Sequence, residues 1–202
     1  MNIKEINVEK ALKKITRNDD LFNGNYTIDP YQNCSFSCSY CDSSLDEKIY
    51  VKRNIIDVLK KEIKSIPKSN IIIGSVHDPY QKIEEKFKIT RKILKTIKEN
   101  NQTFNILTKS DLVLRDLDIL KKIKNCTVTI SITTYDENLR KIFEKNVISA
   151  DKRINLLKKL KENNIKSGIA IIPIIPFITE NQVKKIFEKT DIYNPDFYHY
   201  RY

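Results

Sequence analysis

Short runs of β-branched and apolar residues alternate with amphipathic segments along almost the whole of this 202-residue chain. The short runs predict strands, and apolar residues that recur every three or four positions predict helices. We expect strands at residues 26–29, 71–73, 104–107, 127–132, 169–175 and 197–202. We expect helices at residues 53–66, 83–97, 116–124, 154–160 and 182–189, and an N-terminal helix at residues 3–17.

This alternation predicts an α/β fold with a parallel sheet. Five or six β/α units fit either an open doubly wound sheet or a partial barrel, because right-handed crossovers build both. We expect one domain over residues 1–202, with a helical lead-in at 1–22 and a β/α core at 26–202. Functional groups in both architectures gather at the carboxyl ends of the strands. The segments expected at that edge are the cysteine loop and residues 74–78, 108–110, 131 and 172–173.

Three of the four cysteines form one compact motif, in which Cys34, Cys38 and Cys41 are separated by gaps of three and two residues. Electron-carrying [4Fe–4S] sites use four thiolates, so three cysteines would leave one iron without a protein ligand. A zinc site, the main alternative, normally takes four ligands in close pairs. The remaining candidates, Cys126, His77 and His199, form no such pair. A chain of this length also needs no disulfide framework.

The net charge of +11 is compatible with anionic or nucleotide partners. The lysines are scattered along helical faces, which is typical of solvated surfaces, so we give this charge little weight. The N-terminal residues do not resemble a signal peptide, and no apolar run approaches the roughly 20 residues that span a bilayer. We therefore expect a cytoplasmic protein with no membrane partner, in a compartment where thiols stay reduced.

The cysteine motif, with Tyr40 before its last cysteine, resembles the signature of the radical S-adenosylmethionine (SAM) enzymes. Other segments, in order, resemble the spore photoproduct lyase-like branch of that superfamily. They are residues 29–31, 74–81, 108–110, 116–120, 131–134, 153 and 172–176. The resemblance implies a partial (β/α)6 TIM-like barrel of the radical SAM type. It also implies a [4Fe–4S] cluster on the three cysteines and SAM on the fourth iron, which together generate a 5′-deoxyadenosyl radical that abstracts hydrogen from a substrate.

The same resemblance implies roles for the residues around the cofactors. Lys109 would pair with the SAM carboxylate, and Ser131 would bond the ribose. The backbone of Gly74 and Ser75 would meet the SAM amino group. The remaining cofactor-binding candidates are Tyr40, His77, Ile172 and Pro173, with His77 contacting SAM or substrate. Ordinary packing or local hydrogen bonding stays open for these four and for Ser131.

Two departures from spore photoproduct lyase guide the substrate prediction. Residues 74–78 contain no cysteine where that enzyme has a hydrogen donor, and the sequence stops near the sixth strand. We expect a small modified nucleoside or nucleotide rather than duplex DNA. Queuine lyases are small proteins of this lineage, so we predict release of queuine from queuosine or its 5′-phosphate. The substrate-binding candidates are Tyr31, Asp78, Tyr80, Tyr135 and Tyr200.

An electron donor of the flavodoxin or ferredoxin type is the other partner that this chemistry requires. Two alternatives stay open. One is a radical SAM reaction that repairs or modifies nucleic acid, for which salt-sensitive binding of RNA or DNA would be diagnostic. The other is a zinc-binding or electron-carrying domain without catalytic activity.

Overall fold

The computed structural model describes residues 2–17, 19–41 and 48–200. The strands are β1 (Asn2–Ile6), β2 (Lys13–Lys14), β3 (Tyr26–Ile28), β4 (Tyr31–Gln32), β5 (Lys48–Lys52), β6 (Asn70–Ile73), β7 (Thr103–Thr108), β8 (Thr127–Ser131), β9 (Lys166–Ile171) and β10 (Tyr198–Tyr200). The α-helices are α1 (Ile55–Glu62), α2 (Glu84–Phe87), α3 (Ile89–Glu99), α4 (Leu117–Leu120), α5 (Glu137–Phe143), α6 (Ala150–Glu162) and α7 (Glu180–Thr190). Short 3-10 helices, η2 (Asp111–Asp116) and η3 (Asp191–Tyr193), follow β7 and α7.

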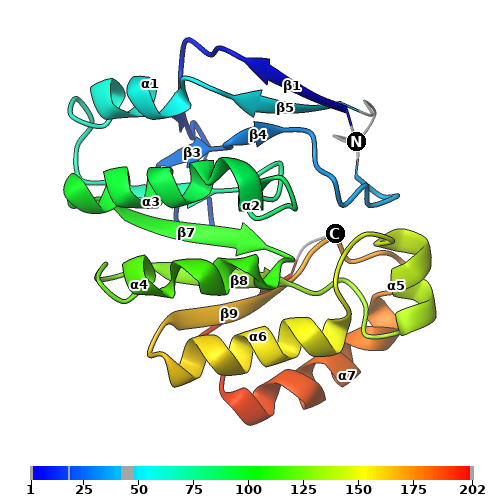
Figure 1. The fold of residues 1–202 in the computed structure, drawn as a ribbon. Coiled ribbons are helices and arrows are strands. Elements are labelled where there is room, and N and C mark those ends of the chain that lie inside the picture. The colour runs from blue at the N-terminus through cyan, green and yellow to red at the C-terminus, as the bar shows by residue number, and fades with distance from the viewer. Residues whose placement is uncertain (1, 18, 42–47, 201–202) are drawn as a thin grey trace.

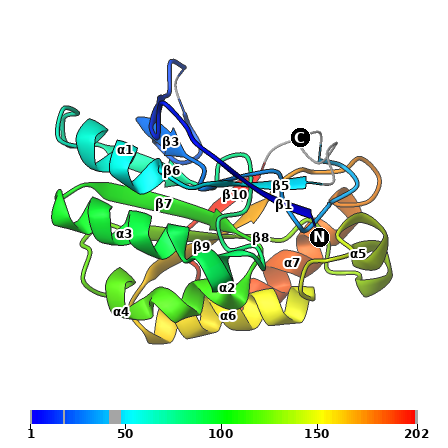
Figure 2. The ribbon, with the colours of Figure 1, turned by 45° about the horizontal axis from the view of Figure 1, so that its top comes forward.

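The main sheet has seven strands in the order β10-β9-β8-β7-β6-β3-β2. Six strands of this sheet are parallel: β3, β6, β7, β8, β9 and β10. Strand β2 adds an antiparallel edge. Among the described strands, β2 and β10 form the two edges, so the barrel is not closed. Helices α3, α4 and α6 cover its outer side (Figures 1 and 2). The predicted α/β fold and its six parallel strands are confirmed.

The core lies between this sheet and its helices. Ile71, Ile72 and Ile73 of β6 are all buried, because both faces of the strand are covered. In α3 the residues Ile93 and Ile97 are fully buried while the polar face is solvated, as the periodicity predicts. No helix in the described ranges is long and apolar enough to cross a bilayer.

The prediction of an N-terminal helix is wrong. Residues 2–6 form β1, which pairs in parallel with β5 in a separate three-stranded sheet, β1-β5-β4. The irregular segment that follows β1 is held by side chains from α1 and the residue before it. Asn54 bonds both the N–H and the carbonyl of Val8, and a carboxylate oxygen of Glu62 accepts the N–H of Leu12 at 2.8 Å. These long-range bonds satisfy backbone groups that a helix would have paired locally, and the sequence alone does not show them.

Candidate cofactor site at the cysteine loop

Cys34, Cys38 and Cys41 line one cavity of about 110 Å³ at the carboxyl ends of the parallel strands. Four segments build its walls: the cysteine loop, the residues after β6, the end of β7 and the end of β8. The lining residues are Cys34, Phe36, Ser37, Cys38, Tyr40, Cys41, Gly74, Ser75, Val76, Asp78, Leu107, Thr108, Lys109 and Ser131. Most segments expected at one edge of the sheet are therefore brought together.

The cysteine loop is held in place by bonds to distant elements. The carbonyl-type oxygen of the buried Gln81 side chain accepts the N–H of Ser35 at 2.9 Å, and its nitrogen donates to the Asn33 carbonyl at 3.0 Å. On the other side, the N–H of Ser39 donates to the carbonyl of Phe143 at the end of α5 (2.9 Å). These bonds hold the cysteine loop from two sides of the fold.

Burial favours the neutral form of the Cys34 and Cys38 thiols. Burial, with the nearby Asp78 charge, raises the pKa of the Cys34 thiol to about 12. Burial also raises the pKa of the Cys38 thiol, an effect that the Lys109 ammonium partly offsets. Metal ligation requires thiolates, so bound iron must displace these protons.

The donor set fits an iron–sulfur cluster better than a single metal ion. Within the described ranges, no three His, Cys, Asp or Glu side chains converge where one ion could sit. A four-iron cluster takes each thiolate on a different iron, so its ligands need not converge on one point. The fourth cysteine, Cys126, lies elsewhere, and its thiol donates to the carbonyl of Leu120 (3.4 Å). All four cysteines are described, and none forms a disulfide.

Lys109 follows the end of β7 and presents a cation at this cavity. Its Nζ donates to the Ser131 hydroxyl at the end of β8 (2.7 Å) and lies 3.9 Å from a carboxylate oxygen of Glu144. The backbone N–H of Lys109 donates to Asp78 (2.7 Å), whose other oxygen accepts the hydroxyl of Thr108 (2.8 Å). Asp78 thus braces the end of β7, and burial raises the pKa of its carboxyl.

The segment after β6 depends on Gly74, whose φ is +84°. A Cβ there would lie 2.3 Å from Cδ of Pro79 and 2.9 Å from the carbonyl oxygen of Leu107, so only glycine fits. Asp29 accepts the Ser75 hydroxyl and the N–H of Val76, both at 3.1 Å. The backbone at Gly74 and Ser75 is consequently fixed against the cavity.

His77, Ile172 and Pro173 do not line this cavity. Burial lowers the pKa of the His77 imidazole, and its Nδ1 has no hydrogen-bond partner among the described residues. The carbonyl of Ile172 accepts the hydroxyls of Ser131 (3.4 Å) and Thr133 (3.2 Å) from the end of β8. The segment at Ile172 and Pro173 therefore lies next to Ser131 but outside the lining of the cavity.

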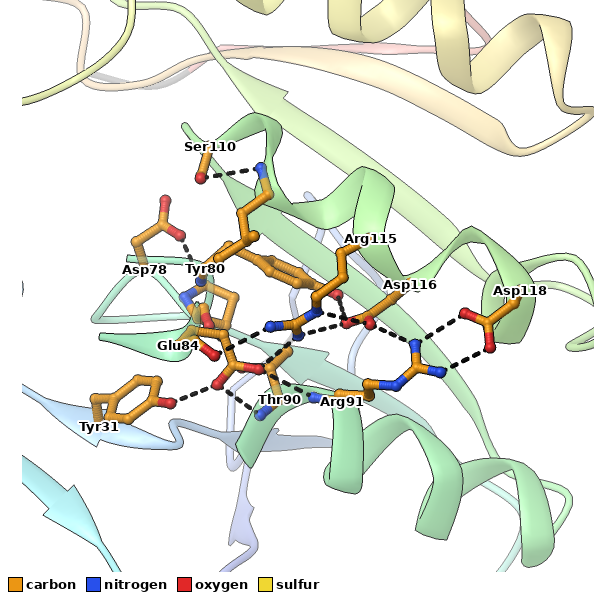
Figure 3. A network of polar contacts seen from close by, with 12 residues as sticks. Tyr31, Asp78, Tyr80, Glu84, Thr90, Arg91, Ser110, Arg115, Asp116 and Asp118 are labelled. Carbon is orange, nitrogen blue, oxygen red and sulfur yellow. Dashed lines mark hydrogen bonds and ion pairs between the residues drawn. The ribbon is translucent and has the colours of Figure 1, made fainter. Parts of the chain in front are cut away.

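Four of the five substrate-binding candidates also lie outside the cavity, and only Asp78 lines it. Tyr31 and Tyr80 are fully buried, and their hydroxyls donate to the carboxylates of Glu84 and Asp116 (Figure 3). The substrate-binding roles predicted for Tyr31 and Tyr80 are therefore wrong, because side chains buried in the interior cannot contact a substrate in the cavity. Tyr135 donates to Asp151 (2.7 Å) beside α6. Tyr200 is 66% exposed on the edge strand β10.

The network that holds these two tyrosines was missed by sequence reasoning. Arg115 binds the buried carboxylates of Glu84 (2.7 Å) and Asp116 (2.9 Å), as Figure 3 shows. Through Glu84, which also accepts the Tyr31 hydroxyl, this network links β4 to η2. Strand β4 precedes the cysteine loop, and η2 follows Lys109. Tyr31, Tyr80 and Asp116 stand in segments that resemble the spore photoproduct lyase-like proteins, but the sequence does not show that they meet. Glu84 reads as an ordinary surface residue.

The fold and the three-cysteine cavity define the class of an iron–sulfur enzyme built on a partial barrel. The chain belongs to the radical SAM superfamily, whose family model matches residues 28–190. It is 39% identical to an uncharacterized protein of Methanocaldococcus jannaschii over 188 residues, covering 88% of this chain and 70% of that one. An uncharacterized protein of Mycobacterium tuberculosis is 24% identical, and the alignment covers 88% of this chain and 57% of that relative.

Solved structures show the same fold. Spore photoproduct lyase with bound SAM and dinucleoside spore photoproduct superposes with a TM-score of 0.72 at 19% identity, over 95% of this chain and 57% of that one. SuiB of Streptococcus suis bound to SAM gives 0.66 at 19% identity, over 87% of this chain and 40% of that one. The chain thus spans just over half of spore photoproduct lyase. The cofactors of this chain, as a member of the radical SAM superfamily, are a [4Fe–4S] cluster and SAM.

Proposed function

We propose that this enzyme abstracts a hydrogen atom from a nucleoside-type substrate. The observation that carries the proposal is the single cavity shared by Cys34, Cys38, Cys41, Lys109 and Ser131. When bound there, the cluster and SAM supply the hydrogen-abstracting radical. The protein contributes binding, orientation and exclusion of water.

The cavity residues divide this work. The three cysteines hold the cluster as thiolates, and the Lys109 ammonium pairs with the carboxylate of SAM. The Ser131 hydroxyl, which already accepts from Lys109, orients that ammonium and reaches the ribose. The fixed backbone of Gly74 and Ser75 meets the amino group of SAM. Tyr40 forms a wall of the cavity, and Ile172 and Pro173 support it from behind Ser131.

A nucleoside-type substrate is supported by the structural neighbours. The neighbour that superposes over more of this chain, spore photoproduct lyase, was solved with a dinucleoside. SuiB, solved with a precursor peptide, superposes less completely. Residues 74–78, the segment beside the cavity, lack a cysteine that could return a hydrogen atom to a repaired product. We therefore propose a lyase that releases queuine from queuosine or queuosine 5′-phosphate through a sugar radical.

Two further points belong to the proposal. A one-electron donor of the flavodoxin or ferredoxin type must reduce the cluster. Cluster thiolates also need a reducing compartment, which favours the cytoplasm. Repair or modification of nucleic acid is the second candidate, and the net charge of +11 is the observation that favours it.

The test is anaerobic reconstitution followed by addition of SAM and dithionite. We would quantify 5′-deoxyadenosine with queuosine, with queuosine 5′-phosphate and without substrate, using Cys34→Ala as the control. Release of queuine together with stimulated SAM cleavage is the expected result. If neither compound changes the rate of SAM cleavage, the assignment of queuosine as substrate is wrong and nucleic acid becomes the substrate to test. No cleavage by cluster-loaded protein would remove the radical SAM reaction itself.

A further inference from the structure

A fully buried ion pair stands directly behind the cavity. Nη2 of Arg153, on α6, lies 2.7 Å from Oε2 of Glu144, and both side chains are 0% exposed. Nη1 of Arg153 donates to the carbonyl of Ser131 (2.9 Å). The Tyr40 hydroxyl donates to Oε1 of Glu144 (2.6 Å). The pair therefore does not line the cavity but contacts two residues that do, Tyr40 and Ser131.

Glu144 is also a nearby anion for Lys109, but it is held back from it. The distance from Oε1 of Glu144 to Nζ of Lys109 is 3.9 Å, whereas Lys109 bonds the Ser131 hydroxyl at 2.7 Å. Each oxygen of Glu144 already has a closer donor, Tyr40 on one and Arg153 on the other. Arg153 therefore fixes the carboxylate short of a contact ion pair with Lys109.

The carboxylate is ionised, so its attraction for Lys109 is real. Burial alone would raise the pKa of Glu144, but the charges of Arg153 and Lys109 outweigh it and lower the pKa. Charges in a buried site attract one another more strongly at shorter separation. If Arg153 were absent, Lys109 would be the other cation of the described ranges within 4 Å of the Glu144 carboxylate, and the two would close together.

We propose that Arg153 is a positioning residue that keeps the Lys109 ammonium available to the carboxylate of SAM by holding Glu144 away from it. This rests on the proposed role of Lys109. Without Arg153, a ligand carboxylate would have to displace Glu144 from Lys109 before it could bind. The Arg153–Glu144 pair thus raises the affinity for SAM, because it prevents Glu144 from pairing with Lys109.

The test is equilibrium dialysis of SAM against cluster-loaded protein. Arg153→Met is expected to weaken SAM binding about tenfold, since Glu144 then competes for Lys109. Arg153→Lys keeps a cation beside Glu144 and should stay close to wild type. Glu144→Gln removes the competitor and should bind SAM at least as tightly as wild type. The double variant Glu144→Gln/Arg153→Met should recover most of the affinity lost in Arg153→Met.

Decarboxylated SAM is the matched probe, because it lacks the group that Lys109 receives. It should bind wild type and Arg153→Met with the same affinity. Circular dichroism and iron content show that each variant is folded and loaded. If Arg153→Met does not fold, the comparison of Glu144→Gln with wild type decides.

Three results would overturn the inference. One is Arg153→Met binding SAM as wild type does, and another is Glu144→Gln binding it tenfold more weakly. The third is a double variant as weak as Arg153→Met. Failure of the proposed function looks different, because then the wild-type protein itself would not bind SAM.

Discussion

Oε1 of Gln81 accepts the backbone N–H of Ser35 at 2.9 Å. Ser35 directly follows Cys34, the first cysteine of the motif. Nε2 of Gln81 donates to the carbonyl of Asn33, so one buried amide satisfies the loop on both sides of Cys34. A leucine cannot replace either bond. Two backbone groups would lose their partners, at about 1–3 kcal/mol for each that stays buried.

Gln81→Leu is accordingly expected to lower both the free energy of unfolding and the iron content after reconstitution. Gln102→Leu is the matched control, because Gln102 is also buried and accepts a backbone N–H, that of Ser69, at 2.7 Å. Gln102 precedes β7, at the opposite end of the strand from Lys109. The control should lose stability but keep its iron. Equal iron content in both variants would contradict the role of Gln81.

Gly74→Ala tests the backbone that faces the cavity. The φ of +84° and the 2.3 Å approach of a new Cβ to Pro79 predict a loss of about 1–3 kcal/mol in the free energy of unfolding. The strain would be relieved by moving residues 75–78 away from Lys109, so SAM affinity should fall as well. Denaturant titration and equilibrium dialysis measure the two effects.

Gly168→Ala separates these effects. A Cβ at Gly168 would also meet its neighbour at 2.3 Å, the carbonyl oxygen of Phe197, but in the pairing of β9 with β10. This variant should lose stability and, once loaded with cluster, bind SAM as wild type does. Unchanged SAM affinity in Gly74→Ala would mean that the backbone there is not part of the cofactor site.

The strands were predictable because local pattern and final environment agree. Ile71, Ile72 and Ile73 read as a buried parallel strand and are one. The strand expected at 169–175 ends early, at Ile171, since Pro173 has no N–H to continue the ladder. The N-terminal strands were not predictable, because β1 is stabilised by pairing with β5, more than forty residues away.

The candidate site, too, was predictable from the sequence only in part. Cysteine spacing and strand-end position predicted the cavity, because both are local properties of the sequence. The residues that brace it were missed or misassigned, since nothing in a sequence shows which polar side chains are buried. Glu84 stands in a charged run with Glu85 and Lys86, yet its side chain is 0% exposed. Tyr31 and Tyr80 stand within the shared segments 29–31 and 74–81, but their side chains are buried in the interior.

Arg115→Met tests the network of Figure 3. Arg115 pairs with the carboxylates of Glu84 and Asp116, both 0% exposed. Its removal leaves two buried anions with less compensation, so the free energy of unfolding should fall by about 3–5 kcal/mol. Lys184→Ala, which breaks an exposed pair with Glu188, should cost less than about 1 kcal/mol. Similar losses in the two variants would show that the network contributes no more than a surface pair.

The raised pKa of Cys34 predicts how the stability of the protein without its cluster depends on pH. Burial raises this pKa from about 9 to about 12, so the folded state keeps the proton that the unfolded chain releases. Its contribution is complete below pH 9 and is lost as the pH rises towards 12, at up to about 1.4 kcal/mol per pH unit.

Cys34→Ser isolates this contribution, because serine does not ionise in that range. Denaturant titrations of the two cluster-free proteins between pH 8 and pH 11 should show wild type losing stability more steeply than the variant. The Cys126 thiol, whose pKa burial raises to about 11, is present in both proteins and cancels in the difference. Parallel losses would mean that the folded protein does not hold the Cys34 proton. A steeper loss in wild type would show that cluster assembly must displace a proton that the fold itself retains, so that iron binding would release the Cys34 proton almost as fully at pH 11 as at pH 8.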